Sequence, residues 1–510
     1  MKFNALGSLK SGSQSYAVLV LCASAAIALP AQTFTTLYSF CAQGLPCADG
    51  AYPYAGLVQA TNGYLYGTTE WGDFAGTVFK ITPNGTLTTL SEFSPSTGYS
   101  SVAGLVQATN GYLYGTASNG GAGQPGTVSV AGTVFKTTPS GTLTPVYSFC
   151  QGECLDGADP TDGLVQAANG YLHGTTHGGI NDTGLPYSYG AVFKMAPSGA
   201  LTTLHTFCPQ GQSQGCTDGA YPYGSLVQAA SGDLYGTTSE GGTGNACAGG
   251  CGTVFKITPS GALTTLYSFC SPNPCTDGVY PYAGLVQAAN GDLYGTTYGD
   301  SDSGVSGTVF KITPSGALTT LHTFSGADGE FPYAGLIQGT DGDLYGTTLY
   351  GGAHGGIDSG GTVFKITPRG TLTTLYSFCS QSQCTDGEYP YGALMQATNG
   401  DFYGTTAGGG ANVNCPGQLP CGTVFRLSTG LGPFVKTLPT AAVVGEAVKI
   451  LGTDLTGATS VSFNGTPAVF TVVSSAEIST TVPAGATTGT VEVVTPSGTL
   501  SSKVQYRVLP

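Results

Sequence analysis

Apolar and polar residues follow a pattern that recurs along most of the chain. The clearest segment begins at Gly56 with the sequence GLVQATNGYLYGTT, and close copies of it follow. Aligned on one glutamine, the copies lie roughly 50 to 60 residues apart, at Gln59, Gln107, Gln166, Gln228, Gln287, Gln338 and Gln396. The sequence therefore contains seven units of one kind, separated by loops of variable length.

Each unit contains four short runs that predict β-strands. The first, AGLVQAT, ends in a turn such as Asn62-Gly63, where we expect positive φ at both residues, and YLYGTT follows. A glycine-rich loop then leads to GTVFKITP and, after a second turn, to TLTTLYSF. Four antiparallel strands per unit match a propeller blade, so we predict an all-β seven-bladed β-propeller over residues 32–430. A β-solenoid is the alternative, but its coils are shorter and lack successive tight hairpins.

The ends of the repeat region predict how the ring closes. The segment from Phe34 to Phe40 has the sequence of a fourth strand, but no unit precedes it. The last unit reaches Gly430 without a fourth strand of its own. We therefore expect the N-terminal strand to complete the last blade, which removes an exposed sheet edge.

Residues 431–510 form a different module, because the repeat and its cysteines stop near Gly432. Short alternating runs separated by Gly or Pro predict a small immunoglobulin-like β-sandwich. The segments Ile450–Leu455, Val461–Ala468 and Val491–Gly498 resemble the IPT/TIG family. That resemblance implies a non-catalytic accessory module.

The repeats themselves resemble the GloVer tandem-repeat family of exported bacterial proteins. Its Gly-Leu-Val signature stands here at Gly56, Gly104, Gly163 and Gly284, with departures at Gly224-Ser225-Leu226, Gly335-Leu336-Ile337 and Gly392-Ala393-Leu394. The resemblance implies an exported protein and no established reaction.

The N-terminus and the cysteines both point to export. Lys2 and Lys10 precede an apolar run that ends in Ala26-Ile27-Ala28, so we predict a cleaved signal peptide over residues 1–31. Setting Cys22 aside, the cysteines fall into seven close pairs, which we interpret as disulfides rather than as zinc ligands. The pairs are Cys41 with Cys47, Cys150 with Cys154, Cys208 with Cys216, Cys247 with Cys251, Cys270 with Cys275, Cys379 with Cys384, and Cys415 with Cys421. The expected location is secreted, extracellular or periplasmic, without membrane insertion after cleavage.

Composition narrows the function classes. Only 8% of the 510 residues are charged and the formal net charge is −14, which argues against a nucleic-acid-binding protein. Seven of the few cations recur at one repeat position, and they would either attract an anionic polymer or pair with local partners: Lys80, Lys136, Lys194, Lys256, Lys311, Lys365 and Arg426.

Two further residue types recur once per blade. An Asp-Gly pair precedes Tyr-Pro-Tyr in most units, which we interpret as an Asx-turn rather than as a calcium ligand. A strand tyrosine, Tyr66 and its equivalents, is expected to fill the core between blades, and the third unit has His173 in its place.

Candidate ligand-binding residues are Trp71, the only tryptophan, and the irregular third unit with Asp159, Asp162, His173 and His177. No known catalytic motif occurs in a supporting context, and we expect no cofactor and no metal. We expect a monomeric, non-enzymatic binding or cell-surface interaction protein whose propeller face contacts an extracellular glycan or protein. Two alternatives remain: a purely structural matrix component, and a polysaccharide hydrolase or lyase with its acids in the loops (Asp159, Asp162, Glu240 or Asp358).

Overall fold

The computed structural model describes residues 32–510 except for short segments at 73–74, 123–130, 151–153, 155, 181–185, 212–214, 230, 245, 272–274, 301–303, 355–358, 413–414 and 416–419. The predicted signal peptide and Asp358 therefore lie outside the described residues. Among the residues that are described, no helix is long and apolar enough to cross a membrane.

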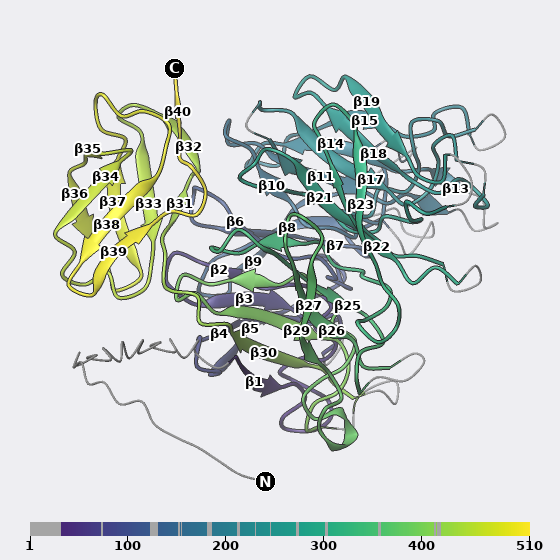
Figure 1. Ribbon diagram of the computed structural model, residues 1–510, viewed down its shortest axis with the longest axis horizontal. Coiled ribbons are helices and arrows are strands. Elements are labelled where there is room, and N and C mark those ends of the chain that lie inside the picture. Colours follow the sequence, from purple (N-terminus) through teal and green to yellow (C-terminus); the bar gives the residue numbers. More distant parts are fainter. Residues whose placement is uncertain are drawn as a thin grey trace, which may run out of the picture.

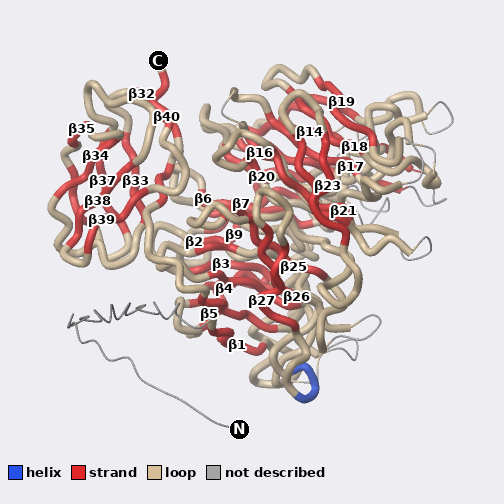
Figure 2. The backbone as a smooth tube through the Cα atoms, viewed as in Figure 1, coloured by secondary structure: helices blue, strands red, loops and turns tan. Residues whose placement is uncertain are grey.

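The repeats form seven four-stranded antiparallel sheets within the described part of the chain, which confirms the all-β propeller fold (Figures 1 and 2). The first four sheets contain β2–β5 (Val58–Gln59, Leu65–Thr68, Thr77–Ile81, Leu87–Glu92), β6–β9 (Val106–Gln107, Leu113–Ala117, Thr133–Thr137, Leu143–Ser148), β10, β11, β14 and β15 (Val165–Gln166, Leu172–Thr176, Ala191–Met195, Leu201–Thr206), and β16–β19 (Val227–Gln228, Leu234–Thr238, Thr253–Ile257, Leu263–Ser268). The remaining three contain β20–β23 (Val286–Gln287, Leu293–Thr297, Thr308–Ile312, Leu318–Thr323), β24–β27 (Ile337–Gln338, Leu344–Thr348, Thr362–Ile366, Leu372–Ser377), and β28–β30 (Met395–Gln396, Phe402–Thr406, Thr423–Ser428) with β1 (Thr33–Ser39). The third unit adds a small hairpin, β12–β13 (Gly179–Ile180, Pro186–Ser188), and a 3₁₀ turn, η2, spans Ser382–Cys384.

The ring closes as the sequence predicts. Strand β1 pairs antiparallel with β30, with Thr33 opposite Ser428 and Ser39 opposite Thr423, so the N-terminal strand is the fourth strand of the last blade (Figure 1). The last blade therefore combines strands from opposite ends of the repeat region, and its outer edge is completed.

The repeated glutamine joins neighbouring blades. In the second blade, Gln107 Oε1 accepts a hydrogen bond from the backbone N–H of Thr61 in the first blade at 2.8 Å. Gln166, Gln228, Gln338 and Gln396 make the same bond to the blade before them. Gln59 bonds the N–H of Thr398 at 2.9 Å and so connects the first blade to the last. We call this set the glutamine belt.

Two details of the predicted hairpins are wrong. The innermost strands have only two residues each, because the preceding Gly-Leu segment does not pair within its blade. A Cβ on Gly56 would come within 2.6 Å of the carbonyl oxygen of Ala393 in the last blade, so neighbouring backbones meet there. In the turn, only Gly63 has positive φ, because Thr61, Asn62 and Gly63 form a three-residue loop closed by the Gly63 N–H to Ala60 oxygen bond.

Buried aromatic residues fill the space between blades. Tyr66 and its equivalents in five other blades are almost fully buried, which confirms the predicted core role. The hydroxyls of Tyr66, Tyr114, Tyr294, Tyr345 and Tyr403 are hydrogen-bonded, as in the 2.8 Å contact between Tyr66 and Asn62. Phe79 packs edge to face on Phe40 of the N-terminal segment, and similar phenylalanine pairs recur around the ring.

The C-terminal module is a two-sheet sandwich beside the ring (Figure 1). Its sheets combine β31, β33, β36 and β37 (Lys436–Leu438, Ala447–Leu451, Phe470–Val472, Glu477–Thr481) with β34, β35, β38 and β39 (Ser460–Phe463, Thr466–Pro467, Val491–Thr495, Gly498–Ser501). A parallel pair, β32 and β40 (Ala441–Val443, Arg507–Leu509), completes it. The module contacts the last blade through the Phe434 N–H to Thr398 oxygen bond and the Thr398–Thr453 hydroxyl pair.

All seven predicted cysteine pairs form disulfides, which confirms the interpretation of the cysteine spacing. The partners in a bond are between 4 and 8 residues apart in the sequence, so each bond closes a short loop and its structural effect is local. The bonds join Cys41 to Cys47, Cys150 to Cys154, Cys208 to Cys216, Cys247 to Cys251, Cys270 to Cys275, Cys379 to Cys384, and Cys415 to Cys421.

Candidate functional site

The recurring cations are paired locally, so they do not form an open anion-binding ring. In the first three blades, the lysine lies over a tyrosine ring, as Lys80 does over Tyr64 at 5.1 Å. In the last four blades, an aspartate replaces that tyrosine and forms an ion pair, at 3.0 Å between Lys365 and Asp343. The structure therefore supports local pairing over attraction of an anionic polymer.

The repeated Asp-Gly aspartates also have structural partners. Asp49 accepts hydrogen bonds from the Tyr38 hydroxyl at 2.7 Å and from the backbone N–H of Ala42 at 3.0 Å. The N–H donor lies upstream in the cysteine loop, so the predicted Asx-turn is wrong in detail, although the following Gly50 has the expected positive φ. His205 and His322 take the place of the tyrosine in two other blades. These aspartates hold the loop against the outer strand.

The disulfide cysteines belong to the blade loops and not to a binding site. Cys47, Cys154 and Cys216 are buried, and Cys275 is a partly buried residue packed against a core cluster between blades. Within the described part of the chain, no cysteine lines the cavity at the centre of the ring. The disulfides therefore close the loops between blades.

Three groups of sulfur and carboxylate atoms nevertheless come close enough to resemble metal sites. In one of them, Cys41 lies beside the Cys415–Cys421 disulfide, with the ligand atoms within 4.8 Å of one another. All the cysteines in these groups are bonded in disulfides, and a metal ion binds the free thiolate. The proximity therefore reflects dense packing of neighbouring loops.

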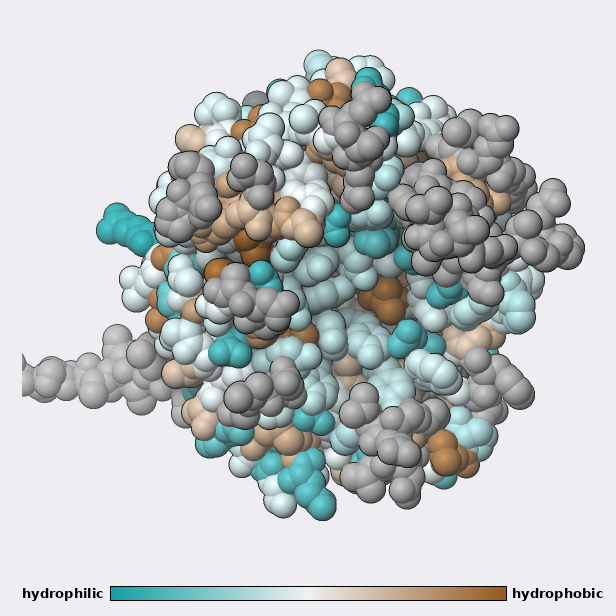
Figure 3. Space-filling view, turned by 90° about the vertical axis from the view of Figure 1, so that its right-hand side faces the viewer, coloured by the Kyte–Doolittle hydropathy of each residue, from teal (hydrophilic) through white to brown (hydrophobic). Residues whose placement is uncertain are grey.

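A cavity of about 650 Å³ runs through the centre of the ring. Figure 3 shows that the face turned away from the C-terminal module is hollowed at its centre. The last tyrosine of each Tyr-Pro-Tyr segment lines this cavity, and so does the tyrosine of the equivalent Phe-Pro-Tyr segment in the sixth blade. This gives five rings: Tyr54, Tyr223, Tyr282, Tyr333 and Tyr391. We call these residues the tyrosine girdle.

The girdle is a continuous chain of aromatic contacts. Ring centroids are 4.8 Å apart for Tyr54 and Tyr391, 5.1 Å for Tyr391 and Tyr333, and 5.5 Å for Tyr333 and Tyr282. Tyr282 continues the chain to Tyr223 at 5.2 Å. Burial raises the pKa of Tyr54 and Tyr282 to about 12, so these phenols stay protonated and can donate hydrogen bonds into the cavity.

The girdle is interrupted at the second and third blades. There Val102 and Thr161 stand where the other blades have tyrosine. The third blade places Asp159, Asp162 and His177 at this interruption, and we call these three residues the polar gap. The His177 ring lies 4.8 Å from Tyr223, so the polar gap directly continues the aromatic chain.

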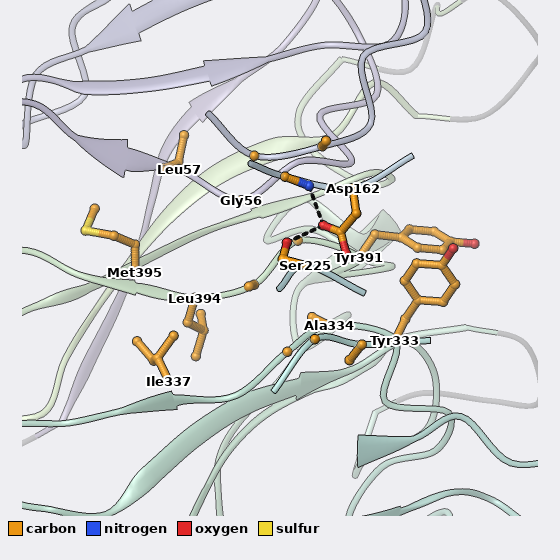
Figure 4. Close-up of a pocket in the computed structure, with 18 of the residues that line it drawn as sticks. Gly56, Leu57, Asp162, Ser225, Tyr333, Ala334, Ile337, Tyr391, Leu394 and Met395 are labelled. Carbon is orange, nitrogen blue, oxygen red and sulfur yellow. Dashed lines mark hydrogen bonds between the residues drawn. The ribbon is translucent and has the colours of Figure 1, made fainter. Parts of the chain in front are cut away.

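Asp162 lines the cavity next to Ser225, on the side where Tyr333 and Tyr391 lie (Figure 4). Its Oδ1 accepts hydrogen bonds from the Ser225 hydroxyl and from the Gly163 N–H, both at 2.5 Å. Burial nevertheless raises the pKa of Asp162 to about 7. The carboxyl group is therefore partly protonated near neutral pH and can act as a proton donor.

Asp159 and His177 form the second half of the polar gap. The Asp159 carboxylate lies 3.7 Å from His177 Nδ1. Burial raises the pKa of Asp159 and lowers that of His177, because both charged forms are removed from water. Asp159 also has positive φ, like the residue at the same position in every other blade, so a turn that recurs around the ring positions it.

The remaining predicted residues have different places. His173 is buried in the strand position of the core tyrosines, and the structure does not bring it to the polar gap. Trp71 is 49% exposed and lies next to Glu70, whose carboxylate accepts a hydrogen bond from the indole. Glu240 is half-buried near Tyr221 and Tyr280, away from Asp162.

Sequence reasoning missed three residues that line the cavity with Asp162. Glu70 follows Gly-Thr-Thr in the first blade. The equivalent position holds a different residue in nearly every blade, and this variability could have marked Glu70 as a candidate. Lys436 and Lys503 reach the other end of the cavity from the C-terminal module, and no repeat pattern marks them.

Comparison with family models identifies the repeats. The model described as the Gloeobacter/Verrucomicrobia repeat matches residues 26–248, 125–303, 183–415 and 247–466. The chain belongs to the Gloeobacter/Verrucomicrobia repeat family. An IPT/TIG domain model matches residues 434–508, which confirms the second resemblance. A comparison with curated proteins finds no match.

Several solved structures are similar to this member of the Gloeobacter/Verrucomicrobia repeat family. A periplasmic gluconolactonase from Pseudomonas aeruginosa shares 17% identity, with 69% of this chain and 94% of that chain covered and a TM-score of 0.40. A PQQ-bound aldose sugar dehydrogenase from Streptomyces coelicolor shares 13% identity, with 78% and 99% covered and a TM-score of 0.36. At such identities and TM-scores, the similarity says nothing about what the repeat protein binds or converts.

Proposed function

We propose that the propeller binds a neutral glycan at the mouth of its central cavity. The observation that supports this proposal is the tyrosine girdle, a chain of aromatic rings broken only where the polar gap supplies carboxyl groups and an imidazole. Sugar rings present C–H faces that stack on aromatic side chains and hydroxyls that bond carboxylates. The cavity volume of about 650 Å³ is in the range of small-ligand sites.

The charges around the mouth favour a neutral ligand over an acidic one. Asp159, Asp162 and Glu70 contribute negative charge at this end of the cavity. Trp71 adds an exposed indole beside Glu70, within reach of a longer sugar chain. The seven disulfides fit an oxidising compartment, which supports action outside the cytoplasm.

A glycan array followed by calorimetry tests the proposal. We expect Tyr333→Ala to weaken binding of a neutral oligosaccharide at least ~10-fold, since one buried aromatic contact contributes more than about 1 kcal/mol. The matched control is Tyr171→Ala, an exposed tyrosine that lies over Lys194 rather than in the cavity. Equal affinities of the two variants, or no binding of any neutral glycan, would refute the proposal.

A hydrolase acting on a polysaccharide is the second candidate, and one observation favours it. Burial holds the pKa of Asp162 near 7, as a general acid requires, and Glu70 is a second carboxyl group lining the same cavity. A reducing-sugar assay separates the two functions. Release of sugar that is lost in both Asp162→Asn and Glu70→Gln supports the hydrolase, whereas binding without release supports the first proposal.

A further inference from the structure

The two lysines at the inner end of the cavity form a site that the proposed glycan binding does not use. Lys436 lies in β31, and Lys503 lies just after β39. An isolated parallel bridge pairs Val435 with Ser502, so the next residue on each segment is one of these lysines. The pairing therefore places two ammonium groups side by side, and both line the cavity.

Neither ammonium group has an acidic partner. Within the described residues, no carboxylate lies within 4.0 Å of Lys436 or Lys503. Lys436 Nζ donates to the backbone oxygen of Gln396 at 2.6 Å and lies 5.5 Å from the centre of the Phe434 ring, which leaves its positive charge uncompensated.

The nearest acid, Asp341, already has other partners. Its Oδ2 accepts a hydrogen bond from the Tyr345 hydroxyl at 2.8 Å and lies 3.9 Å from Lys365. It acts on Lys503 only through space. The other acids of the cavity, Glu70 and Asp162, belong to the mouth lined by the tyrosine girdle.

Two partly buried like charges without counter-ions are costly, and a bound anion lowers that cost. We infer that Lys436 and Lys503 bind an oxyanion group, a sulfate or a carboxylate, at the inner end of the central cavity. The C-terminal module then supplies the cationic wall of a site whose other walls are Met395, Gln396 and Ile337 of the propeller.

The protonation of the lysines provides a second prediction for this site. Burial and mutual repulsion lower the pKa of Lys436 to about 7, and burial lowers that of Lys503 to about 8. An oxyanion binds the protonated pair, so affinity falls as pH rises through these values. The groups that face the pair are Asp341 at its side and the distant Glu70 and Asp162, and none of them reverses this direction.

Calorimetry with the full chain tests the site, using inorganic sulfate and glucuronate as probes and glucose as the neutral control. We expect both anions to bind at pH 6, with affinity at least ~10-fold weaker at pH 9 and in the double variant Lys436→Gln/Lys503→Gln. Binding of sulfate alone would assign the site to a free inorganic anion, whereas binding of glucuronate as well would assign it to carboxylates of organic ligands.

Matched variants keep the test specific. Lys449→Gln removes a lysine of the same module that is paired with Glu477 at 3.0 Å, and it should leave anion binding unchanged. Lys436→Arg/Lys503→Arg keeps both charges and should retain anion binding. This variant keeps the test informative if the Gln double variant fails to fold. Absence of binding by either probe, or unchanged binding in the Gln double variant, overturns the inference. Tyr333→Ala should not change the affinity for sulfate. A failure of the proposed glycan binding can therefore be distinguished from a failure of the anion site.

Discussion

Replacing Asp162 by asparagine should make the stability of the protein less dependent on pH. Asparagine has nearly the shape of the protonated carboxyl group, and its oxygen can still accept hydrogen bonds from Ser225 and Gly163. It cannot ionise. The variant therefore isolates the free-energy cost of holding a negative charge at this position of the cavity wall.

The sign and size follow from the pKa. Asp162 titrates near 7 in the folded protein against 3.8 for the ordinary side chain. The folded state thus binds more protons than the unfolded state between these values, so the wild-type protein loses stability as pH rises from 4 to above 7. About three pKa units correspond to ~4 kcal/mol, and because the group borders the cavity we expect ~2 kcal/mol.

Urea unfolding at a series of pH values measures the effect. The free energy of unfolding of Asp162→Asn minus that of the wild type should increase by about 2 kcal/mol between pH 4 and pH 8. Asp454→Asn, at an exposed position of the C-terminal module, is the control and should show no such trend. A difference between Asp162→Asn and wild type that stays constant with pH would show that the carboxyl group is not desolvated.

Three further changes test the architecture. Gln59→Ala should lower the free energy of unfolding by ~1–3 kcal/mol in urea, because it leaves the buried Thr398 N–H without an acceptor, and Gln59→Glu should recover part of that loss. His173→Tyr should raise the free energy of unfolding by ~1 kcal/mol, because His173 Nδ1 has no partner in the described structure, whereas Tyr66 and Tyr114 at the same position bond the asparagine of their turn; a lower melting temperature would contradict this. Deleting residues 32–40 should expose the edge of β30 and produce larger species in size-exclusion chromatography, whereas an unchanged elution volume would show that β1 is dispensable.

Much of the fold could be predicted because it is repeated. Seven copies of one pattern made the strands and the core tyrosines recognisable, and the missing fourth strand identified β1 as the closing strand. The paired cysteine spacing likewise predicted the disulfides. The exceptions were details of backbone geometry. The loop at Asn62-Gly63, for example, has three residues instead of two, so Asn62 does not adopt the expected positive φ.

The candidate site was only partly predictable, because its contacts join residues that no local pattern connects. The third unit was recognised as irregular, and Asp159 and His177 do lie together, while Asp162 lies near the same tyrosine, Tyr223. The partner of Asp162 is Ser225, which lies 63 residues later in the sequence. Ser225 stands at a repeat position that is glycine in most other blades. Periodicity shows that each residue is unusual in its unit, but only the curvature of the ring shows that they meet.

The pairing of β1 with β30 also determines when the molecule can become complete. Thr33 finds its partner only at Ser428, after every other blade strand has been synthesised. During synthesis from the N-terminus, the first strand stays unpaired until β30 has been made. A chain that stops before β30 cannot pair it. Closure thus depends on the last blade: a product that contains β30 covers this edge, and a product that stops before β30 leaves it open to proteases or to other chains.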